Sequence, residues 1–286
     1  MHSIRTFALT LSTSIALAVP AACDADPDAD PVAGADDDEG PAGGKADGVG
    51  ATCEADSATM YVLSRAADGT HTLLRGSTAD LSLTELGDIE YDGDLWELVP
   101  GAYGYLYTVD RGTDTLVKLS AGTGEVVHTT ALDADMRNNG RGFARSPEGV
   151  LYGLFDGKHL RTIDPSTGET TAVAQLQGIG GGVEAMTFCP DGNLFVAASP
   201  SGSPVGSHLY RVDVGTGGTT SIGRIGAAAI DIDSLTCSAA LQLYGADAVN
   251  TAAGADLQQV DPKTGTRILL GRLATGGYID GVTMAP

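Results

Sequence analysis

Residues 151–173 read LYGLFDGKHLRTIDPSTGETTAV, and this stretch decides the fold. Short β-rich runs begin at Leu151 and His159, and a turn sequence separates the second run from ETTAV. Asp164 can accept a hydrogen bond from a nearby backbone N–H, the proline after it fixes φ, and Gly168 takes a positive φ that other residues resist. The stretch therefore predicts a hairpin turn between two antiparallel strands.

The same pattern recurs along the chain. Four copies occur: TLVKLSAGTGEVV from Thr115, HLRTIDPSTGETT from His159, HLYRVDVGTGGTT from His208 and DLQQVDPKTGTRI from Asp256. A fifth copy, HTLLRGSTADLSL from His71, lacks the Thr-Gly pair. Each copy follows a short apolar run, and these runs begin 46, 45, 43 and 49 residues apart, at Met60, Leu106, Leu151, Leu194 and Leu243.

Each period holds four short β-rich runs, which is the content of one four-stranded propeller blade. Five periods predict an all-β, five-bladed β-propeller. The chain enters the repeat at a second strand, Met60, and ends on an innermost strand, Asp280–Met284. One blade is then built from both termini, which closes the ring and removes exposed sheet edges. A β-sandwich is the competing fold, but it does not need a regular period of this length.

The repeat resembles that of a known family. LYGLFDGKHLRTIDPSTGETTAV and EAMTFCPDGNLF, taken with the other blades, are similar to the YVTN and NHL-like propellers of bacterial extracytoplasmic proteins. The resemblance covers residues 59–286 and implies the propeller fold and a ligand-binding or scaffolding role. Some members of this wider class are enzymes, such as lactonases and glutaminyl cyclases, but their catalytic motifs find no match here.

The N-terminus indicates export. Arg5 precedes an apolar run from Phe7 to Val19, as in a secretory signal peptide, predicted at residues 1–22. Ala21-Ala22-Cys23 resembles a bacterial lipobox, although Pro20 stands where Leu is usual, so we expect lipidation of Cys23, with simple cleavage and secretion as the alternative. Residues 23–52 are rich in Asp, Pro and Gly and predict a disordered acidic tether, followed by the propeller at 53–286. The predicted location is the cell envelope, anchored by lipid outside the cytoplasm.

Charge restricts the partners. The chain has 37 acidic and 16 basic residues and a formal net charge of −21, which repels nucleic acid. We therefore predict no nucleic-acid partner. A membrane contact through the lipid and either a small polar ligand or a protein partner remain.

Aligning the inner strands brings five side chains to one channel mouth, and these are Trp96, Arg141, Glu184, Asp233 and Asp280. They predict a site for a small polar or cationic ligand, or for Ca²⁺ held by Glu184, Asp233 and Asp280, because hard cations take several carboxylate oxygens. Alternatively the carboxylates cap strand and loop N–H groups and Arg141 balances their charge. The long loops 199–207 and 247–255 open on the same side, whereas the Asp-Pro turns belong to the opposite face.

Catalytic motifs are absent from the sequence: there is no G-x-S-x-G, no HExxH and no Walker loop. We therefore predict a binding or interaction module rather than an enzyme, with a calcium-dependent hydrolase such as a lactonase as the alternative. Cys189 and Cys237 lie on consecutive inner strands and point to opposite sheet faces, so they can form a disulfide. A bridge from Cys53 to either of them is the rival pairing.

Overall fold

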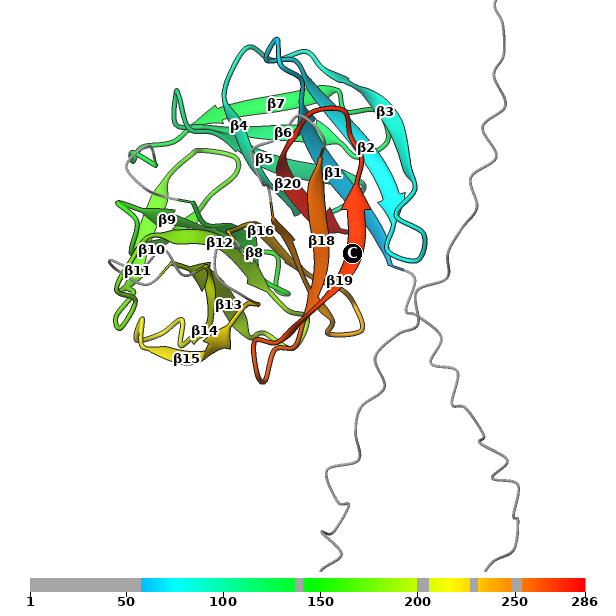
Figure 1. The fold of residues 1–286 in the computed structure, drawn as a ribbon. Helices are drawn as coiled ribbons and strands as arrows, with labels where there is room; N and C mark the ends of the chain where they lie inside the picture. The colour runs from blue at the N-terminus through cyan, green and yellow to red at the C-terminus, as the bar shows by residue number, and fades with distance from the viewer. Residues whose placement is uncertain (1–57, 137–140, 200–205, 227–230, 248–253, 286) are drawn as a thin grey trace, which may run out of the picture. The chain divides into compact units, whose positions relative to one another are not determined.

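The computed structural model describes residues 58–136, 141–199, 206–226, 231–247 and 254–285. Within them the chain forms twenty strands in five four-stranded antiparallel sheets, arranged as a five-bladed propeller (Figure 1). The five-bladed prediction is confirmed. The predicted signal peptide, Cys23, the tether and Cys53 lie outside the described residues. None of the described segments is a helix with the length and apolar character that a membrane span needs.

Four blades each take four consecutive strands from the channel outwards, and the fifth blade takes the last strand of the chain followed by the first three. The innermost strands are β4 (Leu95–Pro100), β8 (Phe143–Arg145), β12 (Val183–Phe188), β16 (Ile232–Cys237) and β20 (Tyr278–Met284). The second strands are β1 (Thr59–Arg65), β5 (Tyr105–Asp110), β9 (Leu151–Phe155), β13 (Leu194–Ala198) and β17 (Leu243–Asp247).

The third strands are β2 (His71–Ser77), β6 (Thr115–Ser120), β10 (His159–Ile163), β14 (His208–Val212) and β18 (Ala255–Val260). The outermost strands are β3 (Leu83–Ile89), β7 (Val126–Ala131), β11 (Thr170–Gln175), β15 (Thr219–Arg224) and β19 (Arg267–Leu273).

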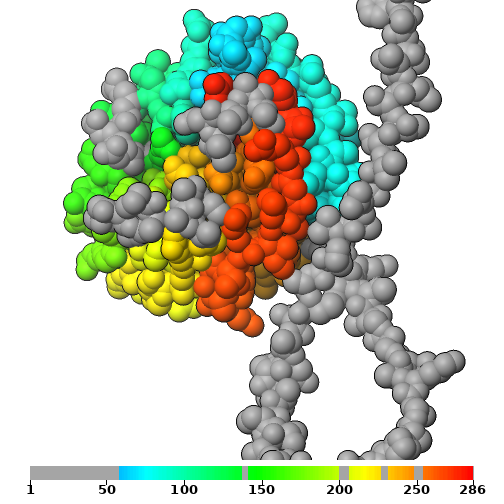
Figure 2. All heavy atoms as spheres, viewed as in Figure 1, coloured from blue at the N-terminus to red at the C-terminus, as the bar shows by residue number. Residues whose placement is uncertain are grey.

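One blade joins the two ends of the chain. Its sheet order is β20-β1-β2-β3, with Met60 opposite Met284 in an antiparallel register. The space-filling view shows C-terminal residues in red against N-terminal residues in blue and cyan (Figure 2). The closure predicted from the phase of the repeat is therefore present.

The core lies between neighbouring blades, so the inner strands of each blade bury both faces. Adjacent residues on β1 illustrate this: Val62 packs in one cluster with Leu257 of β18, whereas Leu63 packs in another with Leu95 of β4. All five residues of β13 are buried. This explains why the second strands read as short continuous apolar runs.

The Asp-Pro turn has the hairpin geometry that the sequence predicts. The Gly168 N–H donates to the Asp164 carbonyl at 2.9 Å, the Asp164 Oδ1 accepts from the Ser166 N–H at 2.8 Å, and Gly168 has a φ of 79°. The turn also has a second role that the sequence did not reveal. A Cβ on Gly168 would lie 1.9 Å from the carbonyl oxygen of Ala131, on the outermost strand of the preceding blade.

The other Thr-Gly turns make the same contact. A Cβ on Gly124 would lie 3.1 Å from the carbonyl oxygen of Gly87, and a Cβ on Gly217 would lie 2.1 Å from that of Gln175. A Cβ on Gly265 would lie 2.9 Å from the carbonyl carbon of Gly223. The Gly217 carbonyl also accepts a hydrogen bond from the Gln177 N–H at 2.9 Å. The repeated glycine therefore both forms a turn and lets one blade approach the backbone of the blade before it.

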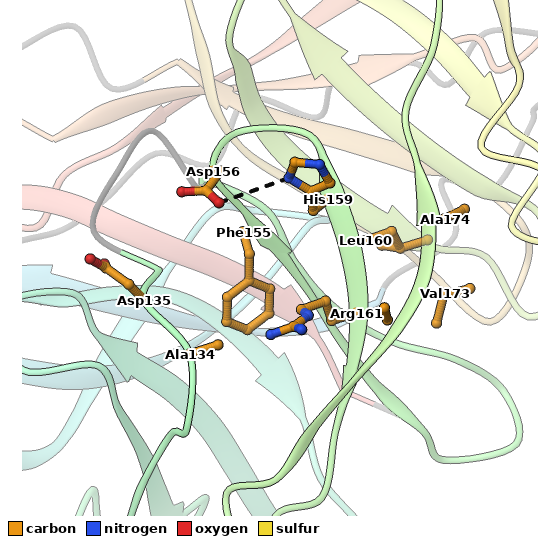
Figure 3. Close-up of a pocket in the computed structure, with 10 residues that line it drawn as sticks. Ala134, Asp135, Phe155, Asp156, His159, Leu160, Arg161, Val173 and Ala174 are labelled. Atoms are coloured by element: carbon orange, nitrogen blue, oxygen red, sulfur yellow. Dashed lines mark ion pairs between the residues drawn. The ribbon is translucent and has the colours of Figure 1, made fainter.

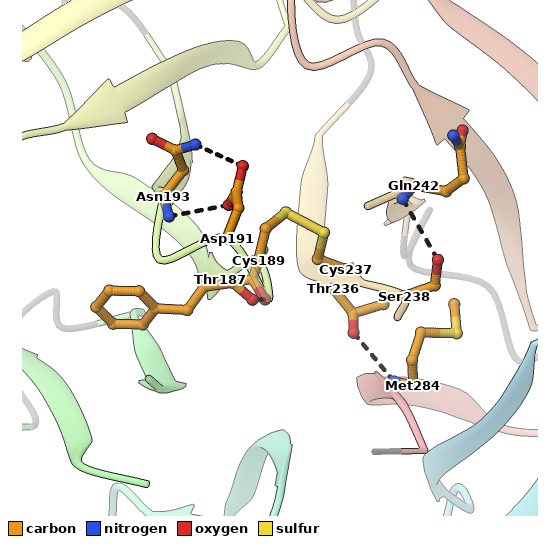
Figure 4. Close-up of a disulfide and its surroundings, with 10 residues drawn as sticks. Thr187, Cys189, Asp191, Asn193, Thr236, Cys237, Ser238, Gln242 and Met284 are labelled. Atoms are coloured by element: carbon orange, nitrogen blue, oxygen red, sulfur yellow. Dashed lines mark hydrogen bonds between the residues drawn. A yellow bond between two sulfur atoms is a disulfide. The ribbon is translucent and has the colours of Figure 1, made fainter. Parts of the chain in front are cut away.

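A disulfide joins Cys189, directly after β12, to Cys237 at the end of β16 (Figure 4). The two Cα atoms are 5.1 Å apart. Beside it the Thr236 hydroxyl accepts from the Met284 N–H at 3.0 Å, so three consecutive inner strands are linked. These links lie at the ends of the inner strands that are remote from the predicted site.

Candidate functional site

The channel mouth is formed where the inner strands begin and the second strands end. Successive antiparallel strands reverse direction, so these ends share one face of the propeller and the Asp-Pro turns lie on the other. One contact ties the predicted residues together: Arg141 Nη1 lies 2.8 Å from Asp233 Oδ1. This ion pair crosses from the residues before β8 to β16, which places both side chains at the mouth.

Trp96 is the aromatic centre of this region. The guanidinium carbon of Arg111 lies 3.5 Å from the centre of the indole, and that of Arg141 lies 5.1 Å from it. Arg111 also lies 3.7 Å from Asp94, and burial lowers the pKa of Arg111. Two cations on one indole give this side of the mouth a positive, aromatic wall.

Glu97 was not predicted from the sequence, and it is the most unusual residue of the site. It is 5% exposed, has a φ of 57°, and its Oε1 atom has no hydrogen-bond partner among the described residues. Burial raises the pKa of Glu97 well above its usual value, and Asp233 adds to the increase while Arg111 and Arg141 oppose it. The carboxyl group is thus affected by the charges of both arginines, and no ion pair joins it to either of them.

The opposite side of the mouth is an acidic wall, formed by Glu184, Asp231, Asp233 and Asp247. Burial raises the pKa of Glu184 to about 7 and that of Asp233 to about 7, and the nearby charge of Asp231 adds to both increases. Burial also raises the pKa of Asp247 to about 6. Unshielded like charges in a partly buried site disfavour ionisation, so this wall holds protons near neutral pH.

Hydroxyl groups from the loop between β13 and β14 fix Glu184. The Ser207 hydroxyl donates to Glu184 Oε2 at 2.5 Å and accepts from the Ile232 N–H at 2.9 Å. The Ser199 hydroxyl donates to Glu184 Oε1. The two ends of the long loop predicted to border the site therefore do contact it; residues 200–205 and 248–253 of the long loops lie outside the described residues.

Asp280 is engaged elsewhere on the mouth. Arg65 Nε donates to Asp280 Oδ2 at 2.8 Å and Arg65 Nη2 to Oδ1 at 3.2 Å. His71 Nε2 lies 3.5 Å from Asp280 Oδ2, and His71 is 1% exposed. A paired arginine thus occupies both oxygens of this carboxylate.

No family model matches the chain, and no curated protein resembles it. Its fold, however, is common among solved structures. A chain in "Crystal structure of Nidogen/Laminin Complex" aligns with a TM-score of 0.53 and 12% identity, covering 80% of this chain and 98% of that one. A chain in "The de novo evolutionary emergence of a symmetrical protein is shaped by folding constraints" aligns with a TM-score of 0.52 and 18% identity. The alignment covers 79% of this chain and 98% of that one.

A virginiamycin B lyase from Staphylococcus aureus also aligns, with a TM-score of 0.44 and 12% identity over 75% of this chain and 70% of that one. At these identities the likeness concerns the fold alone.

The predicted calcium site needed Glu184, Asp233 and Asp280 to converge. Among the residues that the structure describes, no three His, Cys, Asp or Glu side chains are placed to hold a metal ion. Arg141 binds Asp233 and Arg65 binds Asp280, so the arginines take the positions that a cation would need. The geometry gives the calcium hypothesis no support.

Residues that the sequence missed come mainly from the ends of second strands. Arg65, Arg111 and Ser199 occupy the same position of the repeat, six residues into each second-strand run, and Asp247 is one position earlier. Aligning the second strands as well as the inner ones would have found them. The pattern gives no such signal for Glu97, whose equivalents in the other blades are the small residues Gly142, Ala185, Ser234 and Gly281.

Replacing Glu97 with Met is expected to raise the free energy of unfolding by roughly 1–3 kcal/mol, because it removes a buried carboxyl group whose Oε1 atom has no hydrogen-bond partner among the described residues, and it keeps the side-chain length. Chemical denaturation at pH 7 measures this. The same exchange at Glu169, an exposed residue of the β10–β11 turn, is the control and should change stability by less than about 0.5 kcal/mol. A destabilised Glu97→Met variant would show that the carboxyl group has a stabilising partner.

Proposed function

We propose that this protein is an exported propeller, tethered to a membrane through a lipidated Cys23, that binds a small organic cation at the channel mouth. The observation that carries the ligand class is the acidic wall. Among the described residues, Arg141 is the one cation that forms an ion pair with its four carboxyl groups, and the negative charges of Asp231 and Glu184 oppose that of Asp233. An ammonium or guanidinium group placed against Glu184 would relieve this repulsion and favour the ionised carboxylates.

The propeller supports such a role because the site is rigid. Glu184 is held by two serine hydroxyls, and the acidic wall rests on inner strands whose neighbours are buried on both faces. A preorganised site spends little binding energy on ordering its side chains. The positive wall at Trp96 excludes a second cation, which favours a ligand with one charged end.

Calorimetric titration with n-butylammonium tests the proposal, with n-butanol and butyrate as neutral and anionic controls. We expect butylammonium to bind more tightly at pH 8 than at pH 6, because the wall is more fully ionised at pH 8. Glu184→Gln should weaken binding about tenfold or more, whereas Glu169→Gln, which makes the same change on the opposite face, should leave it unchanged.

Equal heats for butylammonium and butanol at pH 8 would overturn the proposal, as would unchanged binding by Glu184→Gln. The tether is tested separately by the intact mass of the mature chain, which reveals whether Cys23 carries acyl chains.

A further inference from the structure

A hollow in the blade of β8–β11 includes none of the acidic-wall residues. It has a volume of about 430 Å³ and is formed by the end of β9, by β10 and β11, and by the segment that follows β7 (Figure 3). Six of its ten lining residues are apolar, including Phe155, Leu160 and Val173. The volume falls within the range of sites that bind small molecules.

Arg161 is the functional group of this hollow. Its guanidinium carbon lies 5.6 Å from the centre of the Phe155 ring, and its Nη1 donates to the Thr170 hydroxyl at 2.8 Å. Figure 3 shows the guanidinium beside the ring, directed towards Ala134. The aromatic ring and the hydroxyl therefore hold the cation in one orientation.

Within the described part of the chain, no carboxylate forms an ion pair with Arg161. Arg65, Arg111, Arg141 and Arg272 each have an aspartate within 4.0 Å, whereas Arg161 has none among the described residues; what sets Arg161 apart from other arginines without an ion pair is its place in the hollow, beside the Phe155 ring. The cation of this hollow is available to an anion from outside.

The other polar groups of the hollow are already engaged. His159 Nδ1 lies 3.9 Å from Asp156 Oδ2 at the rim, and Asp135 has an interaction of its own. The remaining lining is apolar or small, with Ala134, Ala172 and Ala174 leaving room beside Arg161. The hollow thus combines one positioned cation with an apolar wall, and its lining also includes the two aspartates Asp135 and Asp156.

We propose that this hollow is a second binding site, for a small carboxylate with an apolar body, whose carboxylate pairs with Arg161 while its body lies beside Phe155, Ala134 and Ala172. Guanidinium and carboxylate groups form two parallel hydrogen bonds, which fixes the orientation of such a ligand. The site is independent of the proposed cation site, because it takes the opposite charge and shares none of its residues.

Fluorine NMR of 4-fluorobenzoate, titrated with the full chain, tests this site. 4-Fluorobenzyl alcohol is the neutral probe of similar size. We expect the protein to broaden the benzoate signal more than the alcohol signal, and Arg161→Gln to weaken benzoate binding about tenfold. Arg161→Lys should keep part of the affinity, and Arg211→Gln, at an exposed residue of β14 in the next blade, should change nothing.

A second variant keeps the test independent of the stability of Arg161→Gln. Ala172 is exposed and lies opposite Arg161 in the β10–β11 register, so Ala172→Glu places a carboxylate across the strands from the guanidinium. It should block benzoate binding, whereas Thr171→Glu, which points to the other face of β11, should block it far less. Equal broadening of both probes, or benzoate binding that survives Arg161→Gln and Ala172→Glu, would overturn the proposal.

Discussion

Replacing Gly168 with Ala is expected to lower the free energy of unfolding by roughly 3 kcal/mol or more, the range of severe overpacking combined with a strained backbone. Two effects add at this position. The φ of 79° is unfavourable for a residue with a Cβ, and that Cβ would lie 1.9 Å from the Ala131 carbonyl oxygen of the preceding blade. Relief requires the two blades to separate. Urea denaturation followed by far-UV circular dichroism measures the change.

Gly192→Ala is the matched control. Gly192 has a similar φ of 84°, but a Cβ there meets no atom within 4 Å. Only the backbone effect remains, so a loss of about 1 kcal/mol is expected. If the two variants lost the same stability, the contact between blades would contribute nothing and the glycine would serve the turn alone.

The repeat predicted the fold because blade geometry is a local property of the sequence. The turn at Asp164–Gly168 and the four runs per period follow from residues close in the chain, and the phase of the repeat at its two ends, Met60 and Met284, then predicts how the ring closes. The contact of Gly168 with Ala131 could not be predicted in the same way. It depends on how closely two blades approach, which no single blade encodes.

The site was predicted less completely for a related reason. Aligning inner strands found Trp96, Arg141 and Asp233, which the structure brings into one connected group. Asp280 aligned equally well but is bound by Arg65, because the end of β1 lies beside it in the closing blade. Alignment identifies which positions share the mouth, but the choice of partner depends on side-chain reach and on the packing of neighbouring blades.

The acidic wall should make the propeller less stable as the pH rises. The folded-state pKa values of Glu184 and Asp233, about 7 each, and of Asp247, about 6, lie above the usual values of 4.5 and 3.8. The folded protein therefore binds more protons than the unfolded chain between about pH 4 and pH 7, and stability is lost as the pH rises through this range. Turn aspartates such as Asp164 have lowered pKa values in the folded protein, so their contribution to stability is lost as the pH falls below about 4.

We accordingly expect the thermal midpoint to be highest near pH 4 and to fall by roughly 5 °C or more by pH 8, since 1 kcal/mol shifts the midpoint of a domain of this size by about 2–4 °C. The Gln side chain in Glu184→Gln can still hydrogen-bond with the two serines, but it cannot ionise. The thermal midpoint of this variant should therefore fall less with rising pH than that of the wild type. Glu169→Gln, on an exposed turn, should fall as the wild type does. A midpoint that stays constant from pH 5 to pH 8, or an equal fall in Glu184→Gln, would mean that the wall does not hold these protons, and the electrostatic basis for binding a cation there would be lost.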